Sequence, residues 1–118
     1  MREMTTKEMA LLAAKALDDK KGIQIRLLKT DEVTVLSEYF LICTGTSNTQ
    51  IKTLCDAVEK VMDEIGEPAL HREGHRSGTW VLLDFGFLVV HVFTEEARKF
   101  YDLERLWSDA TPVMLDSI

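Results

Sequence analysis

The sequence predicts an α+β domain in which a mixed β-sheet of about five strands packs against helices. Two segments carry apolar residues at the spacing of amphipathic helices, and several shorter ones are continuously apolar or alternate between apolar and polar. The predicted elements follow the order α-β-β-α-β-β-β-α. The 118 residues suffice for a single domain over residues 1–118, with its core over about residues 5–107.

The first predicted helix begins at Thr5 and Glu8, which have the spacing of a capping box. Apolar residues at helical spacing continue as far as Leu17, and Gly22 is expected in the left-handed conformation that follows many helix ends. Residues 23–27 then alternate between apolar and polar side chains, which predicts a half-buried strand.

A buried strand and the longest helix are predicted next. After a polar loop at residues 29–37 with one short helical turn, residues 39–43 are continuously apolar, as in a strand covered on both faces. A turn at residues 45–48 leads into a helix over about residues 49–65, whose apolar side chains form a single stripe. Gly66 is the expected end of this helix.

The remaining part of the chain is predicted to add three strands and a helix. A short strand starts at Leu70 and becomes a polar loop, and residues 80–83 and 88–93 form an antiparallel hairpin. Thr94-Glu95-Glu96 is typical of a helix start, and the helix that follows is expected to reach Trp107.

The charge and the cysteine content restrict the partners and the compartment. The net charge of −6 argues against direct binding of DNA or RNA, which needs a basic surface. The two cysteines lie in apolar runs and suggest no disulfide framework. The chain shows neither a signal segment nor an apolar stretch of membrane-spanning length, so we expect a cytoplasmic protein without a membrane partner.

Metal binding is not predicted. His71 and His75 are four residues apart, but Gly74 between them argues against the helix that would align them. Cys43 and Cys55 lack the close pairing of a structural zinc site. No cofactor is expected either.

The turn Gly45-Thr46-Ser47, placed after a strand, is similar to the glycine-serine turn with which nucleotidyltransferases position a triphosphate. Those enzymes also need two or three clustered carboxylates for paired magnesium ions, and Asp84 is the only acidic residue on the later core strands. Ser47 is also suited to capping the helix that follows. The turn is compatible with a nucleotidyltransferase-like fold without catalytic residues, and a nucleotide-binding enzyme using this turn and Asp84 is kept as the alternative.

The predicted hairpin carries apolar side chains on both faces. Trp80, Leu82 and Asp84 share one face of the first strand, and His91 and Phe93 share one face of the second. A sheet face rich in aromatic residues and left uncovered is typical of an interaction surface. The alternative is that helices cover both faces of the sheet and that these residues belong to the core. When only the periodicity is considered, this alternative is slightly favoured.

Several segments in this order resemble the bacterial ribosome silencing factor family, also called the oligomerisation-domain family, which has mitochondrial and chloroplast relatives. The resemblance covers about Ala14 to Trp107 and rests on residues 16–22, 37–47, 72–74, 78–86, 89–93 and 100–107. The turn of the predicted hairpin departs from the family pattern. The family usually has Asp-Tyr-Gly-Asp there, and this chain has Asp84-Phe85-Gly86-Phe87.

The resemblance implies a non-enzymatic repressor of translation. Such a protein binds the large ribosomal subunit through ribosomal protein L-fourteen and sterically blocks joining of the small subunit when nutrients are scarce. The organellar relatives imply a contribution to large-subunit biogenesis. A homodimer that uses the apolar face as its own interface is a further reading.

The residues expected to contact the partner or to support the contact are mostly aromatic, because aromatic side chains dominate interface hot spots. Asp84 and Glu104 are expected to pair with basic groups of the partner, and Phe93 and Trp107 also suit packing between helix and sheet. The full set is Trp80, Leu82, Asp84, His91, Phe93, Tyr101, Glu104 and Trp107.

Overall fold

The computed structural model describes residues 4–30, 37–74, 79–101, 105 and 110–115. Its helices are α1 (Thr6–Asp19), α2 (Asn48–Glu64) and α3 (Glu95–Tyr101). Its strands are β1 (Ile23–Lys29), β2 (Tyr39–Gly45), β3 (His71–Glu73), β4 (Trp80–Asp84), β5 (Leu88–Thr94) and β6 (Thr111–Val113). The predicted α+β class and the predicted order of the first eight elements are confirmed.

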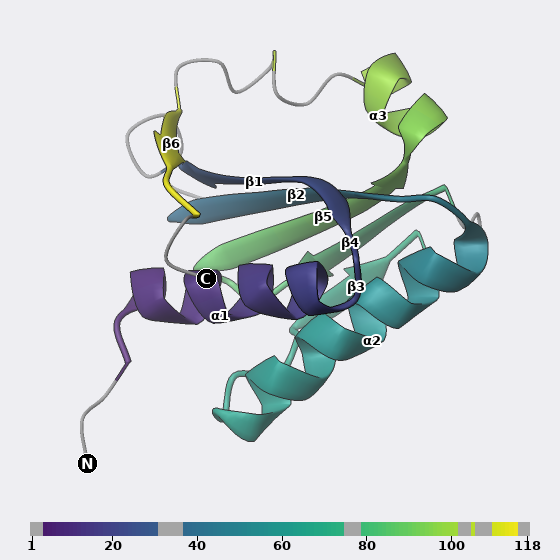
Figure 1. Cartoon of the computed structure of the whole chain (residues 1–118). Helices are drawn as coiled ribbons and strands as arrows, with labels where there is room; N and C mark the ends of the chain where they lie inside the picture. Colours follow the sequence, from purple (N-terminus) through teal and green to yellow (C-terminus); the bar gives the residue numbers. More distant parts are fainter. Residues whose placement is uncertain (1–3, 31–36, 75–78, 102–104, 106–109, 116–118) are drawn as a thin grey trace.

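The strands form one mixed sheet in the order β3-β4-β5-β2-β1-β6 (Figure 1). β2 and β5 pair in parallel at its centre, and each of the other neighbouring pairs is antiparallel. β2 is buried along its whole length, as its continuous apolar run predicts.

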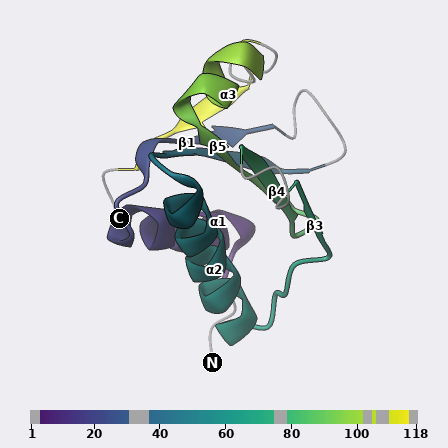
Figure 2. The same ribbon diagram turned by 90° about the vertical axis from the view of Figure 1, so that its right-hand side faces the viewer.

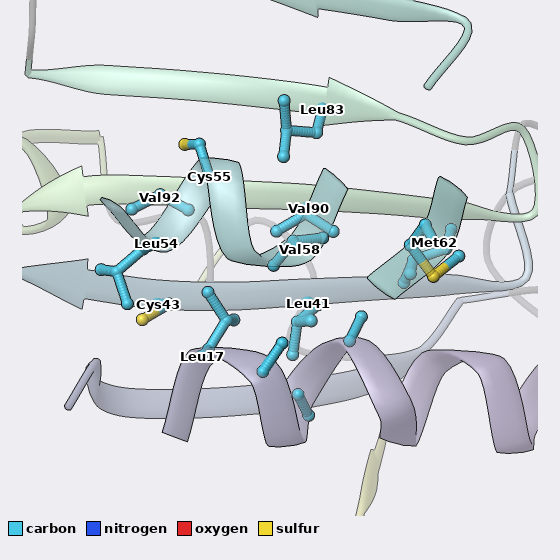
Figure 3. Packing of buried hydrophobic residues seen from close by; sticks show 14 of the residues in the cluster. Leu17, Leu41, Cys43, Leu54, Cys55, Val58, Met62, Leu83, Val90 and Val92 are labelled. Atoms are coloured by element: carbon cyan, nitrogen blue, oxygen red, sulfur yellow. The ribbon is translucent and has the colours of Figure 1, made fainter. Parts of the chain in front are cut away.

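α1 and α2 cover the same face of the sheet, and α3 lies on the opposite side (Figures 1 and 2). The apolar stripes of α1 and α2 pack against side chains of β2, β4 and β5 and form the larger of two cores (Figure 3). Residues of this core that the close view labels include Leu17, Leu41, Leu54, Val58, Met62, Leu83, Val90 and Val92. Of the helices in the described residues, none is suited to crossing a membrane.

The smaller core lies on the other face and fixes α3 to the sheet. Thr94 caps α3, because its hydroxyl oxygen accepts the backbone N–H of Ala97 at 3.2 Å. Arg98 is 8% exposed, and its guanidinium donates to the Gln24 carbonyl at 2.5 Å and to the Thr44 hydroxyl at 2.9 Å. These bonds tie the helix to adjoining positions on β1 and β2.

β6 is the element that the sequence did not predict. It has three residues and contains Pro112, whose missing N–H makes it a poor strand former except at a sheet edge. β6 is such an edge, pairing with residues 27–29 of β1, and it extends the fold beyond the predicted core limit at residue 107. Beyond Tyr101, the predicted final helix is described only at Arg105, which is helical, and most of the predicted loop at residues 29–37 lies outside the described residues.

The start of α1 matches the prediction, but its end does not. Thr5 and Glu8 form the expected capping box. The left-handed residue after the helix is Lys21, with φ of 65°, and not Gly22 as predicted. Gly22 is required for a different reason, because a Cβ atom there would lie 2.5 Å from the Cys43 sulfur and 3.1 Å from the Leu17 carbonyl oxygen.

We predict that Gly22→Ala lowers the free energy of unfolding by about 1–3 kcal/mol, because the added methyl group overpacks the contact between the end of α1 and β2. Cys43→Ala removes the sulfur that the methyl group meets, so the double variant should lose less than the sum of the two single losses. Denaturant unfolding of the four proteins measures this coupling. Strictly additive losses would contradict the steric explanation.

Candidate protein-binding face

Four rings gather on the face of the sheet opposite α1 and α2. Phe40 on β2, Trp80 on β4, and His91 and Phe93 on β5 form this aromatic cluster. The His91 ring centroid lies 5.0 Å from that of Phe40 and 6.0 Å from those of Trp80 and Phe93. The Trp80 and Phe93 centroids are 5.2 Å apart. At these separations the rings attract one another beyond the effect of buried area.

The strand register produces this grouping. β4 pairs Trp80 with Phe93, Leu82 with His91 and Asp84 with Val89, so all six side chains lie on one face. This confirms the predicted alternation of the hairpin. His91 is also opposite Ile42 of β2 in the parallel pair.

Solvent reaches the described part of this face at Trp80 and Leu82. Phe93 has no exposed surface and His91 is 4% exposed, so both belong to the core in the free chain. Trp80 and Leu82 are half-buried and present apolar surface to solvent. The face therefore combines a buried aromatic floor with two partly exposed side chains, as many protein interfaces do.

His91 is held in one orientation by its neighbour. The Trp80 indole N–H donates to His91 Nδ1 at 3.2 Å, and within the described residues His91 Nε2 has no hydrogen-bond partner. Burial lowers the pKa of His91 to about 4, so the ring is neutral at physiological pH. A buried donor left without a partner costs on the order of 1–3 kcal/mol.

Asp84 shapes the turn that follows β4. Its carboxylate oxygen accepts the backbone N–H of Gly86 at 2.8 Å, and the side chain is half-buried.

The two aromatic residues at which this turn differs from the family pattern are both packed against other side chains. Phe85 is 4% exposed, and Phe87 packs against the larger core.

The other predicted site residues are described less fully. Tyr101 is the last residue of α3, and Glu104 and Trp107 lie outside the described residues. Two contributors to the site were missed by the sequence reasoning, Phe40 and Arg98. The continuous apolar run of β2 does not reveal which face Phe40 occupies, although its even spacing from Ile42 was a usable signal.

The residues of the enzyme alternative do not meet. Gly45 is opposite Thr94 at one end of the central pair, whereas Asp84 is opposite Val89 near the other end. Five residues of extended strand separate these levels, about 17 Å. The nucleotide-binding enzyme that uses the turn and Asp84 is therefore wrong.

The Gly45-Thr46-Ser47 turn has a structural explanation. Ser47 caps α2, since its hydroxyl oxygen accepts the Gln50 N–H at 3.1 Å, as predicted. A Cβ atom on Gly45 would lie 2.8 Å from a side-chain carbon of Ile51. The glycine thus allows the first turn of α2 to pack closely on β2.

The two cysteines show no metal-binding geometry, and His75 lies outside the described residues. Cys43 and Cys55 are free and buried, and burial raises the pKa of each thiol to about 12. They are therefore protonated at neutral pH and poorly suited to bind metal. Within the part of the chain that the structure describes, no three histidine, cysteine or acidic side chains converge.

We predict that His91 makes stability depend on pH. The unfolded chain binds a proton near pH 6.5 and the folded chain only near pH 4, so stability is complete above pH 6.5 and is lost as pH falls toward 4. Between about pH 7 and 5 the native protein should lose about 2 kcal/mol more than His91→Phe. Denaturant unfolding at several pH values measures this, with the exposed His71 changed to Gln as the control. Equal losses in the native protein and His91→Phe would contradict the buried neutral ring.

Comparison with known proteins identifies the family. A family profile described as "RsfS: Ribosomal silencing factor during starvation" matches residues 3–118. The ribosomal silencing factor RsfS of Halalkalibacterium halodurans is 38% identical over 115 residues, which cover 98% of each chain. A crystal structure of a Chromobacterium violaceum protein superposes with a TM-score of 0.86 at 42% identity, covering 89% of this chain and 88% of that one.

Organellar proteins match over less of their own length. The chloroplastic Iojap protein of maize is 37% identical over 109 residues, which are 90% of this chain and 46% of that protein. A mouse protein named for mitochondrial assembly of the ribosomal large subunit is 31% identical over 75 residues, 61% of this chain and 33% of its own. The profile match over nearly the whole chain and the bacterial relatives establish that this chain belongs to the RsfS family of ribosomal silencing factors, which are not enzymes.

Proposed function

We propose that this chain binds the large ribosomal subunit through ribosomal protein L-fourteen, and that the bound protein sterically blocks joining of the small subunit and so represses translation. Family membership implies binding to the large subunit. The observation that carries the rest is the aromatic cluster, which lies on the sheet face opposite α1 and α2 and reaches solvent through Trp80 and Leu82.

Trp80 and Leu82 are the proposed anchors of the contact. Tryptophan is among the side chains that contribute most to interfaces, and both residues already present apolar surface that a partner would cover. His91 and Phe93 support them from below, because both rings lie within 6.0 Å of the Trp80 ring. Tyr101 is the last residue of α3, which lies on the same side of the sheet, and Tyr101 is proposed to extend the contact together with Glu104 and Trp107, which come later in the sequence.

Charge favours a basic protein partner over bare RNA. The chain carries 20 acidic and 14 basic residues, and a ribosomal protein with a basic surface would complement it. Asp84 lies on the same face as Trp80 and Leu82 and is proposed, with Glu104, to pair with cationic groups of the partner. Such rim charges mainly increase the rate of encounter and fix the orientation.

The proposed mechanism requires only that the protein occupies its site on the large subunit, and no covalent bond is made or broken. A stable interface covers about 800 Å² on each partner, about a ninth of the chain's surface of 7122 Å². The remaining surface would project from the large subunit into the space that the small subunit needs. The proposed site of action is the cytoplasm, where the subunits join.

Two further roles are proposed on narrower grounds. The name of the mouse relative supports a contribution to large-subunit biogenesis. A second copy of the chain could also cover the aromatic cluster, since half-exposed apolar side chains suit a homodimer as well. Light scattering measures the molar mass of the isolated protein. A dimer in the native protein that becomes a monomer in Trp80→Ala would support a homodimer through this face.

We predict that saturating amounts of the protein prevent purified subunits from forming joined ribosomes in a sucrose gradient, and that Trp80→Ala needs at least about 10-fold more protein for the same effect. Met114→Ala is the matched control, because Met114 is 74% exposed and follows β6 at the opposite edge of the sheet from β4. Unchanged formation of joined ribosomes with the native protein would contradict the proposed function. Equal potency of Trp80→Ala would contradict the proposed surface.

We also predict that binding weakens as salt is raised, because exposed charge pairs are screened. Asp84→Asn should reduce the affinity a few-fold and make the salt dependence shallower, while its amide oxygen still accepts the Gly86 N–H. Asp63→Asn, an exposed change on α2, is the control and should leave both unchanged. Binding to the large subunit at several salt concentrations tests this, and identical slopes for the native protein and Asp84→Asn would overturn the role of Asp84.

A further inference from the structure

One polar atom beneath the proposed binding face has no partner. Among the described residues, the buried side-chain atoms without a hydrogen bond are Arg72 Nε and His91 Nε2. The guanidinium of Arg72 is otherwise engaged, since its Nη1 donates to Glu59 at 2.8 Å. His91 has a single remaining ring nitrogen, and that nitrogen is the unpaired one.

The bond from Trp80 determines what this nitrogen is. An indole N–H can only donate, so His91 Nδ1, which lies 3.2 Å from it, must accept. A neutral imidazole that accepts at Nδ1 carries its proton on Nε2. His91 therefore presents a hydrogen-bond donor, in a tautomer fixed by its neighbour.

The surroundings of this donor are apolar. Phe40 and Phe93 lie against the His91 ring, with centroids 5.0 and 6.0 Å away. The residues opposite His91 on the adjoining strands are Ile42 and Leu82. None of these four side chains can accept a hydrogen bond from Nε2.

We propose that His91 is a specificity-determining residue of the aromatic cluster, whose Nε2–H is paired when the protein partner covers this face and supplies an acceptor, a carbonyl or carboxylate oxygen. This inference rests on the proposed function and names the chemistry by which the partner is recognised. Docking requires a side-chain displacement over His91, and Leu82, which is opposite His91 and which solvent already reaches, is the neighbour that can move while the Trp80 bond to Nδ1 is kept. A partner without a suitably placed acceptor would leave the donor unpaired, which discriminates against it.

The test compares His91→Phe with His91→Gln. Phenylalanine keeps a ring against Phe40 and Phe93 but is somewhat larger, and it removes the Nε2–H donor together with the Nδ1 atom that accepts the Trp80 indole N–H. Denaturant unfolding at neutral pH is therefore measured beside the affinity for the purified large subunit, which should fall about 10-fold. Glutamine restores an N–H donor and should recover a large part of that loss. Ile42→Val, a small packing change beside His91, is the control and should alter the affinity less than about 2-fold.

Each outcome is informative. Loss of affinity in His91→Phe under conditions in which the variant stays folded, with recovery in His91→Gln, supports the inference. Native-like binding by His91→Phe, or a loss that His91→Gln does not recover at all, would overturn it while leaving the proposed function standing. Failure of the native protein to bind the subunit would overturn both. Nitrogen-15 NMR of histidine in the free protein should show the Nε2–H tautomer, and the Nδ1–H tautomer would also overturn the inference.

Discussion

The parallel pairing of β2 with β5 is the constraint on which both faces of this protein depend. Seven residues of each strand are in register, from Tyr39 opposite Leu88 to Gly45 opposite Thr94. On one face this pairing aligns the side chains that α1 and α2 cover. On the other it brings Phe40 of β2 against His91 of β5, with ring centroids 5.0 Å apart. Together with the register of β4 on β5, it sets Asp84 about 17 Å along the strands from the level of Gly45, so the nucleotidyltransferase-like turn serves packing.

The two faces of the sheet differ in how they are covered, and this difference supports the functional proposal. Two long amphipathic helices, α1 and α2, bury the first face over most of the sheet (Figures 1 and 2). The second face carries the shorter α3, which Arg98 fixes to Gln24 and Thr44. Trp80 and Leu82 therefore stay partly exposed above buried rings. A firm aromatic base beneath two accessible apolar side chains is suited to a protein contact, and it needs no catalytic group.

Local patterns in the sequence predicted most of the fold and part of the site. Alternation along β4 correctly grouped Trp80 with Leu82, and alternation along β5 grouped His91 with Phe93, because side chains on a strand alternate by necessity. The pairing register, which alternation within one strand does not contain, puts the two groups on the same face. Alternation could not place Phe40, since every residue of β2 is buried. The bond from Arg98 to Gln24 joins residues 74 apart in sequence, and the need for glycine at position 22 arises from Cys43 on another strand. Such contacts depend on tertiary packing, which local patterns do not contain.

The central claim, that Trp80 contacts ribosomal protein L-fourteen, is tested most directly by crosslinking. A photoreactive amino acid at position 80, in the protein bound to purified large subunits, should crosslink to L-fourteen, and the same group at the exposed position 63 of α2 should not. Mass spectrometry of the crosslinked peptides identifies the partner. Crosslinks from position 80 to ribosomal RNA or to a different ribosomal protein, or crosslinks to L-fourteen from position 63 alone, would contradict the account.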